Sequence, residues 1–259
     1  MSKIKSYIQS INNKNEKVLS IFLTSGYPNK NNFVENAIEI LENGADIIEL
    51  GIPFSDPLAD GPTIQASSQH SLENGITLKD SFEFAERIKA KTDKPIIAMG
   101  YANPIITYGY EKFIKDAYNS GIDGLIVPDV PLEEHDYFFD PLKDELDIIL
   151  LTTPTSSEDK IKKIDFRSSG FVYCVSVTGT TGVRNTFSND VFDKLEKTYN
   201  LIQSNKMLIG FGISNPDDVK KFSNYCDGVI VGSAVIKSLS SNRFEETIKL
   251  IQSLKQACK

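Results

Sequence analysis

A short apolar segment, a polar turn and a segment with helical spacing recur in the same order along the whole chain. Eight apolar segments have the composition of β-strands, at Val18–Leu23, Ile47–Leu50, Pro95–Met99, Gly124–Val127, Ile148–Leu151, Phe171–Val175, Met207–Ile209 and Gly228–Val231. Segments with helical spacing follow them, at Phe33–Glu42, Leu78–Lys91, Glu111–Asn119, Glu133–Glu145, Glu158–Phe166, Val191–Leu201, Pro216–Asn224 and Phe244–Gln256. This alternation of strand and helix is typical of parallel βαβ units.

The predicted strands are almost uniformly apolar, which indicates that both of their faces are buried, as in a parallel sheet covered by helices. Eight strand–helix units in 259 residues match the size of a single (β/α)8 TIM barrel. Residues 4–11 add an N-terminal helix. No linker or shift in composition divides the chain, so we expect one domain over residues 1–259. A doubly wound open sheet is the alternative, because repetition alone does not demonstrate closure.

The net charge and the cysteine content limit which classes of partner the protein can bind and where in the cell it is expected. The chain has 28 Lys and Arg against 35 Asp and Glu, a formal net charge of -7, which argues against nucleic acid and anionic membranes as partners. No segment approaches the roughly 18 consecutive apolar residues of a membrane-spanning helix, and the N-terminus lacks the apolar core of a signal peptide. The 3 cysteines are too few to stabilise a domain of this size by disulfide bonds. These features predict a cytoplasmic protein.

One carboxylate interrupts the second apolar strand. Glu49 lies between Ile48 and Leu50. Burial disfavours the charged form of a carboxyl group and raises its pKa toward the range that suits a general acid or base. The alternative is a structural carboxylate that is satisfied by hydrogen bonds. We favour a catalytic role, because a Glu is rarely buried without a partner or a function.

A second carboxylate, Asp60, lies in the polar loop that follows this strand. Asp-Gly-Pro is also an ordinary turn sequence, so the spacing alone leaves Asp60 evenly balanced between a catalytic and a loop-shaping role. A carboxylate in an apolar strand and another in a polar loop would differ in pKa, a pattern that separates an acid from a base. In a barrel, both would lie at the carboxyl end of a strand, where active sites are built.

Glycines gather after the last three predicted strands, in residues 176–184, 210–214 and 232–234. Glycine lets backbone N–H groups approach an anion closely, and the N-terminus of a following helix adds a favourable dipole. The loops after strands seven and eight are a frequent phosphate site in such barrels. Any single glycine is explained by a tight turn, whereas three clusters at consecutive strand ends predict phosphate binding.

Other catalytic chemistries lack their residues. No predicted strand carries a lysine in its interior or at its carboxyl end for Schiff-base catalysis. The 2 histidines, His70 and His135, are far apart and form no metal-binding motif, so no metal is expected. Cys174 lies inside an apolar strand with no evident histidine base, which indicates core packing. Of the reaction types considered, the residues therefore favour proton transfer by carboxylates on a phosphorylated small molecule.

One continuous stretch closely resembles the signature of the tryptophan synthase alpha chain family: residues 49–65, with the sequence ELGIPFSDPLADGPTIQ. Shorter matches cover essentially the whole chain, at residues 22–28, 100–104, 127–131, 173–182, 210–214 and 231–234. The resemblance implies a (β/α)8 barrel that cleaves indole-3-glycerol phosphate to indole and glyceraldehyde 3-phosphate. It implies that Glu49 transfers protons, that Asp60 stabilises positive charge at the indole nitrogen, and that Tyr173 lies beside Glu49.

The resemblance also implies the remaining site residues, which form four groups. The groups are an apolar slot for indole (Phe22, Met99, Tyr101, Val127 and Phe211), a phosphate site (Gly182, Gly212, Gly232 and Ser233), a lid over residues 178–189 in which Thr181 contacts Asp60, and a partner interface (Asp56, Pro57, Asn103 and Pro104). Core packing is the alternative for each apolar residue, above all for Met99 and Val127. The chain departs from the family at two positions: Val177 stands where some members have arginine, and Ala102 where many have tyrosine.

The implied partner is a beta chain, in a heterotetramer of two alpha and two beta chains. The beta chain carries pyridoxal phosphate and receives indole, so no cofactor is expected on this chain. Two other functions stay open: an enzyme for another phosphosugar on the same scaffold, and a non-catalytic subunit that regulates a partner. The presence of both Glu49 and Asp60 argues against the second.

Overall fold

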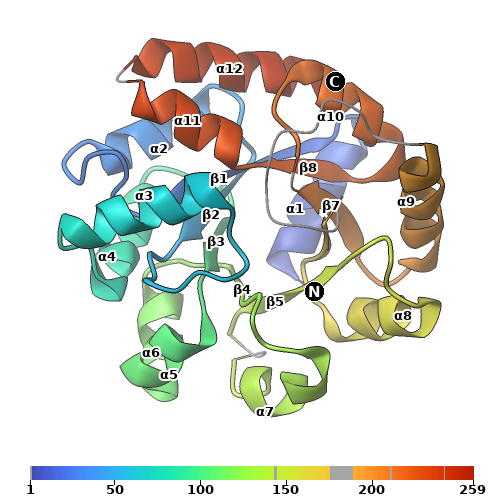
Figure 1. Cartoon of the computed structure of the whole chain (residues 1–259), viewed down its shortest axis with the longest axis horizontal. Helices are drawn as coiled ribbons and strands as arrows, with labels where there is room; N and C mark the ends of the chain where they lie inside the picture. The colour runs from blue at the N-terminus through green and yellow to red at the C-terminus, as the bar shows by residue number, and fades with distance from the viewer. Residues whose placement is uncertain (1, 143–144, 176–188, 211, 242) are drawn as a thin grey trace.

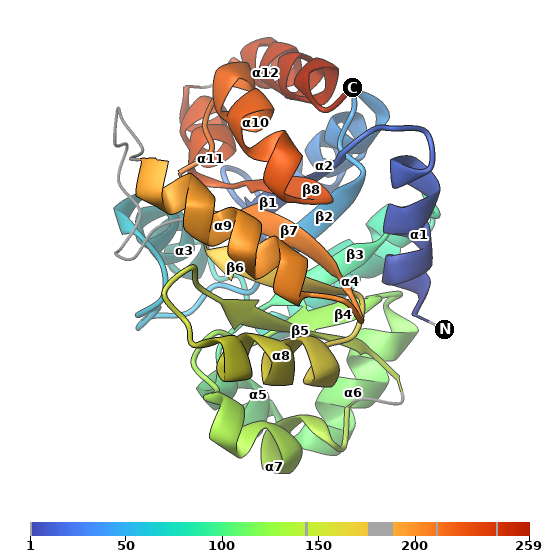
Figure 2. The ribbon, with the colours of Figure 1, turned by 90° about the vertical axis from the view of Figure 1, so that its right-hand side faces the viewer.

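The structure, a computed structural model, describes residues 2–142, 145–175, 189–210, 212–241 and 243–259. Within these residues, eight parallel strands form a closed barrel in the order of the sequence, and β8 pairs with β1 (Figures 1 and 2). The strands are β1 (Val18–Thr24), β2 (Ile47–Gly51), β3 (Ile96–Met99), β4 (Gly124–Ile126), β5 (Asp147–Thr152), β6 (Phe171–Val175), β7 (Lys206–Gly210) and β8 (Gly228–Val231). The predicted (β/α)8 barrel is confirmed, and the open-sheet alternative is wrong because hydrogen bonds between β1 and β8 close the sheet.

Helices cover the barrel (Figure 1), and the first of them packs Ile4, Ile8 and Ile11 against the residues that fill its interior. They are α1 (Lys3–Asn12), α2 (Phe33–Glu42), α3 (Pro62–Glu73), α4 (Leu78–Lys89), α5 (Ala102–Tyr108), α6 (Tyr110–Asn119), α7 (His135–Phe139), α8 (Glu158–Arg167), α9 (Asn189–Leu201), α10 (Pro216–Phe222), α11 (Ser233–Ser240) and α12 (Phe244–Ala257), with 3-10 turns at Leu132–Glu134 and Ser223–Tyr225. None of the helices described is long and apolar enough to cross a membrane.

The barrel wall separates two apolar clusters, which explains why the strands are apolar at nearly every position. In β1, Leu19 and Ile21 belong to the outer cluster that packs against the helices. Val18 and Phe22 belong to the inner cluster that fills the barrel. Because side chains alternate along a strand, every second residue of β1 faces the interior.

Some predicted helices differ from those observed. The continuous helix predicted over Glu133–Glu145 is wrong: a 3-10 turn and the short α7 replace it, and α7 ends at Phe139. Pro141 follows, and proline has no N–H for a helical hydrogen bond and disfavours a helical conformation in the residue before it. Helices α3, α5 and α11 were not predicted. The inward face of α3 carries buried serines in place of an apolar stripe, so its sequence lacks the usual helical pattern.

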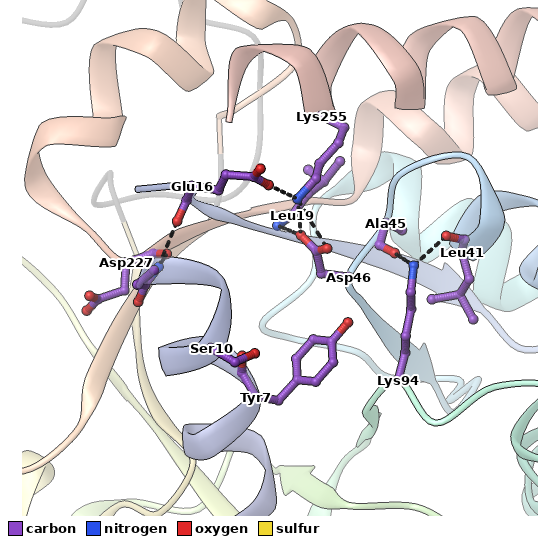
Figure 3. Close-up of polar contacts among 11 residues, drawn as sticks. Tyr7, Ser10, Glu16, Leu19, Leu41, Ala45, Asp46, Lys94, Asp227 and Lys255 are labelled. Carbon is purple, nitrogen blue, oxygen red and sulfur yellow. Dashed lines mark hydrogen bonds and ion pairs between the residues drawn. The ribbon is translucent and has the colours of Figure 1, made fainter. Parts of the chain in front are cut away.

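Ion pairs and hydrogen bonds of charged side chains to the backbone stabilise the end of the barrel at which the strands begin (Figure 3). Asp46 accepts a hydrogen bond from the backbone N–H of Leu19 at 2.8 Å and another from Lys255 Nζ at 2.9 Å. Lys255 also lies 3.4 Å from Glu16. Lys94 Nζ donates to two backbone carbonyls, at 2.7 and 2.8 Å. These contacts tie α12 and the loops to the strands, so this end contributes to stability.

Candidate active site

A cavity opens at the end of the barrel where the strands finish. Its walls come from strand ends, from the loops after them and from the first turns of α3 and α11. The lining residues are Phe22, Glu49, Asp60, Gly61, Thr63, Ile64, Met99, Tyr173, Gly212, Ile213, Ser214, Ile230, Gly232, Ser233, Ala234 and Lys237. The fold therefore brings the two predicted carboxylates and the described glycine clusters to one site.

Glu49 faces the barrel interior because β2 alternates its side chains. Ile48 and Leu50 pack in the outer cluster, and Glu49 lies on the opposite face with 1% of its surface exposed. Its Oε1 atom accepts a hydrogen bond from Ser20 Oγ at 2.9 Å, whereas Oε2 has no hydrogen-bond partner among the residues described. Burial raises the pKa of Glu49 to about 8, and the Ser20 hydrogen bond opposes that rise. The carboxyl group is therefore largely protonated at neutral pH.

Asp60 differs from the expectation of a polar setting, because its side chain is buried, with 8% of the residue exposed. The Tyr101 hydroxyl donates to Asp60 Oδ2 at 2.9 Å, and the same hydroxyl oxygen accepts from the backbone N–H of Ala59 at 3.1 Å. Burial raises the pKa of Asp60 to about 6, and the Tyr101 hydrogen bond opposes the rise. Asp60 therefore ionises at a lower pH than Glu49, which leaves one carboxylate and one carboxylic acid near neutral pH.

Tyr173 lines the cavity from the inward face of β6. Burial raises the pKa of its phenol well above the usual value, and the nearby charges of Glu49 and Asp60 raise it further. The hydroxyl group is therefore neutral over the physiological range. A neutral phenol donates a hydrogen bond but supplies no base.

Two glycines make room for aromatic rings that line the cavity. A Cβ atom at Gly210 would lie 2.1 Å from the hydroxyl oxygen of Tyr173, and one at Gly51 would lie 2.4 Å from the ring of Phe22. Both distances are far below a van der Waals contact. Any larger residue at Gly210 would therefore displace Tyr173, and any larger residue at Gly51 would displace Phe22.

The structure separates the residues that were predicted for the indole slot. Phe22 and Met99 line the cavity. Tyr101 does not line it and instead lies behind the Asp60 carboxylate that it holds. Val127 packs in the outer cluster, because it follows an inward-facing residue at the end of β4. Phe211 lies outside the described residues.

Several lining residues were missed by sequence reasoning. Ile230 occupies an inward position of β8, which strand alternation would have identified. Thr63 and Ile64 lie in the first turn of α3, and Lys237 lies one turn into α11. These two helices were not predicted, so their residues had no assigned position. Ser214, by contrast, lies within the predicted glycine cluster at residues 210–214 and does line the cavity.

Two of the glycines predicted to bind phosphate, Gly212 and Gly232, line the cavity. Gly212 has a φ of 82°, in the left-handed region that favours glycine. Gly232 is the N-cap of α11 and Ser233 is its first residue, and both line the cavity. The first N–H groups of a helix have no intrahelical partner and are suited to an anion. Gly182 and Thr181 lie outside the described residues.

The residues predicted for the partner interface differ in exposure. Asp56 and Asn103 are exposed, Pro104 is half-buried and Pro57 is buried. Leu58, beside them in the loop after β2, is 85% exposed.

The other titratable candidates have structural surroundings. His70 contacts the carbonyl oxygen of Pro28 at 2.9 Å, and His135 is buried on α7. Within the described ranges, no three His, Cys, Asp or Glu side chains gather in a way that could hold a metal ion. Cys174 is buried in the outer cluster, where burial raises the pKa of its thiol, which confirms core packing.

Comparisons with known proteins agree with this arrangement. The model of the tryptophan synthase alpha chain family matches residues 8–259. The tryptophan synthase alpha chain of Petrotoga mobilis is 42% identical over 260 residues, which cover 100% of this chain and 98% of that protein.

Among solved structures, a protein from Aquifex aeolicus superposes with a TM-score of 0.92 at 36% identity, covering 100% of both chains. A tryptophan synthase structure from Mycobacterium tuberculosis superposes with a TM-score of 0.91 at 29% identity, covering 99% of this chain and 98% of that one. The chain belongs to the tryptophan synthase alpha chain family.

Proposed function

We propose that this chain cleaves indole-3-glycerol phosphate to indole and glyceraldehyde 3-phosphate. The observation that carries the proposal is the state of Glu49. Its carboxyl group lines the cavity, has one oxygen without a hydrogen-bond partner among the described residues, and has a pKa of about 8. A group with such a pKa gives and takes a proton readily near neutral pH.

The reaction needs one proton delivered and one removed. Glu49 donates a proton to C3 of the indole ring, which turns the ring into an acceptor of electrons. Glu49, now a carboxylate, takes the proton of the glycerol C3′ hydroxyl group. The C–C bond between the ring and the side chain then breaks, its electron pair passes into the ring, and the C3′ carbon becomes an aldehyde. Glu49 ends in the protonation state in which it began.

Asp60 and Tyr173 stabilise the charges that develop. With a pKa of about 6, Asp60 is an anion at neutral pH and compensates the positive charge that forms at the indole nitrogen. The neutral phenol of Tyr173 lies in the same cavity and supplies a hydrogen-bond donor. The substrate phosphate binds at Gly212, Gly232 and Ser233, which holds the indole end toward the two carboxylates.

Family membership implies a beta chain as partner, and alpha chains of this family do not themselves bind pyridoxal phosphate. We propose two alpha and two beta chains in the complex, with Asp56, Asn103 and Pro104 at the contact and with the cofactor on the beta chain. Their exposed or half-buried positions support this. A single domain over residues 1–259 and a cytoplasmic location stay predictions.

The test is release of indole from indole-3-glycerol phosphate by the purified chain, with and without a beta chain. Indole and glyceraldehyde 3-phosphate should appear in equal amounts, and Glu49→Gln should release neither while keeping its fold. An amide preserves the shape of the side chain but does not exchange the proton. Near-normal turnover by Glu49→Gln would remove Glu49 from the mechanism. A folded wild-type chain that releases no indole would favour another phosphosugar or a regulatory subunit.

A further inference from the structure

A serine hydroxyl group lies inside the barrel, next to Glu49. Ser20 is fully buried on β1, between the inward-facing residues Val18 and Phe22. Its Oγ atom donates to Glu49 Oε1 at 2.9 Å. In the part of the chain that the structure describes, the Ser20 side chain makes no other hydrogen bond.

The surroundings of Ser20 do not otherwise call for a polar group. Val18, Ile47 and Phe22, which flank it on β1 or pair with it in register, are apolar and buried. A hydroxyl group buried in apolar surroundings is costly unless it is hydrogen-bonded. Ser20 does not line the cavity, so it would not contact a substrate bound there. Its hydroxyl group therefore acts on Glu49.

We propose that Ser20 is a positioning residue that decides which oxygen of Glu49 exchanges the proton. A protonated carboxyl group has one donor oxygen and one acceptor oxygen. The Ser20 hydroxyl donates to Oε1 and makes it the acceptor, which leaves the exchangeable proton on Oε2. Oε2 is the oxygen that has no hydrogen-bond partner among the described residues. This inference deepens the proposed function and rests on it.

The same hydrogen bond stabilises Glu49 after the proton has left. The negative charge spreads onto Oε1, where the Ser20 hydroxyl donates, so the bond favours the ionised form. It thereby lowers a pKa that burial alone would raise further. The other titratable groups in the described lining of the cavity are Asp60, Tyr173 and Lys237. All three are retained in variants of Ser20.

The first experiment titrates Glu49 directly in the full-length chain without substrate. The glutamate side-chain carboxyl carbons are labelled with 13C, and the Glu49 signal is assigned by its loss in Glu49→Gln. Ser20→Ala should move the Glu49 titration upward by about one pH unit, because a hydrogen bond to a charged group is lost. Ser20→Thr keeps the hydroxyl group and should restore the wild-type titration. An unchanged titration in Ser20→Ala would overturn the proposal.

The second experiment measures indole release as a function of pH and substrate concentration. Ser20→Ala should lower kcat about tenfold and leave KM unchanged, because Ser20 has no contact with the cavity. The matched control is Ser120→Ala, which removes a buried serine hydroxyl that donates to the carbonyl of Ala117, in the turn that precedes β4. Its kcat and pH profile should match those of the wild type.

The outcomes distinguish a failure of the Ser20 positioning role from a failure of the proposed cleavage reaction. A Ser20→Ala variant with wild-type kcat and pH profile would overturn the positioning role, and so would a fall in kcat that Ser120→Ala reproduces. A folded wild-type chain that cleaves no substrate would refute the proposed function instead. In that case the carbon titration still tests the hydrogen bond, because it does not depend on activity.

Discussion

The buried carboxyl group of Glu49 predicts a pH dependence of stability that one amide substitution removes. Its pKa is raised from 4.5 to about 8 in the folded chain. The folded state therefore binds more protons than the unfolded state between these values. The stabilising contribution is complete below pH 4.5, the unfolded value, and is lost as the pH rises through 8, the folded value.

The magnitude follows from the width of this window. One pH unit within it corresponds to about 1.4 kcal/mol. Between pH 5 and pH 8, Glu49 should thus lower the free energy of unfolding of the wild type by about 3.5 kcal/mol, because the slope decreases as the pH approaches the folded pKa. Glu49→Gln carries no titrating group at this position and should escape that loss. At about 2 °C per kcal/mol for a chain of this size, the difference in Tm between variant and wild type should grow by about 7 °C.

The assay is urea or thermal unfolding, followed by far-UV circular dichroism at several pH values between 5 and 8. The quantity of interest is the difference between Glu49→Gln and the wild type, because all other titratable groups are common to both proteins. Glu245→Gln, at an exposed position in the first turn of α12, makes the same chemical change and should show a constant difference. If the Glu49→Gln difference is also constant with pH, burial does not raise the Glu49 pKa and the acid–base argument fails.

Three further predictions concern the cavity wall. Gly212→Ala should raise KM for the phosphorylated substrate. The matched control is Gly75→Ala, at a similar φ of 73°, where an added Cβ would have no neighbour within 4 Å. It should lose comparable stability, about 1 kcal/mol, but keep its KM. An equal KM in both variants would place the phosphate elsewhere. Lys237 is a basic residue in the lining of the cavity, so we expect it to attract the phosphate. Lys237→Met should raise KM several-fold and flatten the salt dependence of kcat/KM. An unaltered salt dependence would contradict this role. Tyr101→Phe removes a hydrogen bond that lowers the pKa of Asp60, so the acidic limb of the pH–kcat profile should move upward from about 6; a fixed limb would mean that Asp60 does not govern it.

The positions of the strands could be predicted because they depend on local composition, whereas closure of the barrel depends on the pairing of β1 with β8, which are distant in the sequence. Apolar composition with β-branched and aromatic residues favours a strand in a segment such as Phe171–Val175, and the observed β6 has the predicted limits. The dependence on local composition also explains why some helices were predicted incorrectly or missed. Residues 133–145 have helical composition, but Pro141 interrupts them. Helix α3 packs serines against the barrel, so its sequence has no apolar pattern from which a helix could be predicted.

What the sequence determined by itself was the fold class, the family, and two carboxylates and a set of glycines suited to a phosphorylated substrate. Only the tertiary structure decided the surroundings of those groups. Asp60 is buried under Tyr101, Val127 faces the outer layer, and Ser20 donates to a carboxylate 29 positions away. Burial and hydrogen bonding depend on which side chains the strand pairing and the alternation of each strand bring together. These contacts join residues that are distant in the sequence, so local pattern carries no record of them.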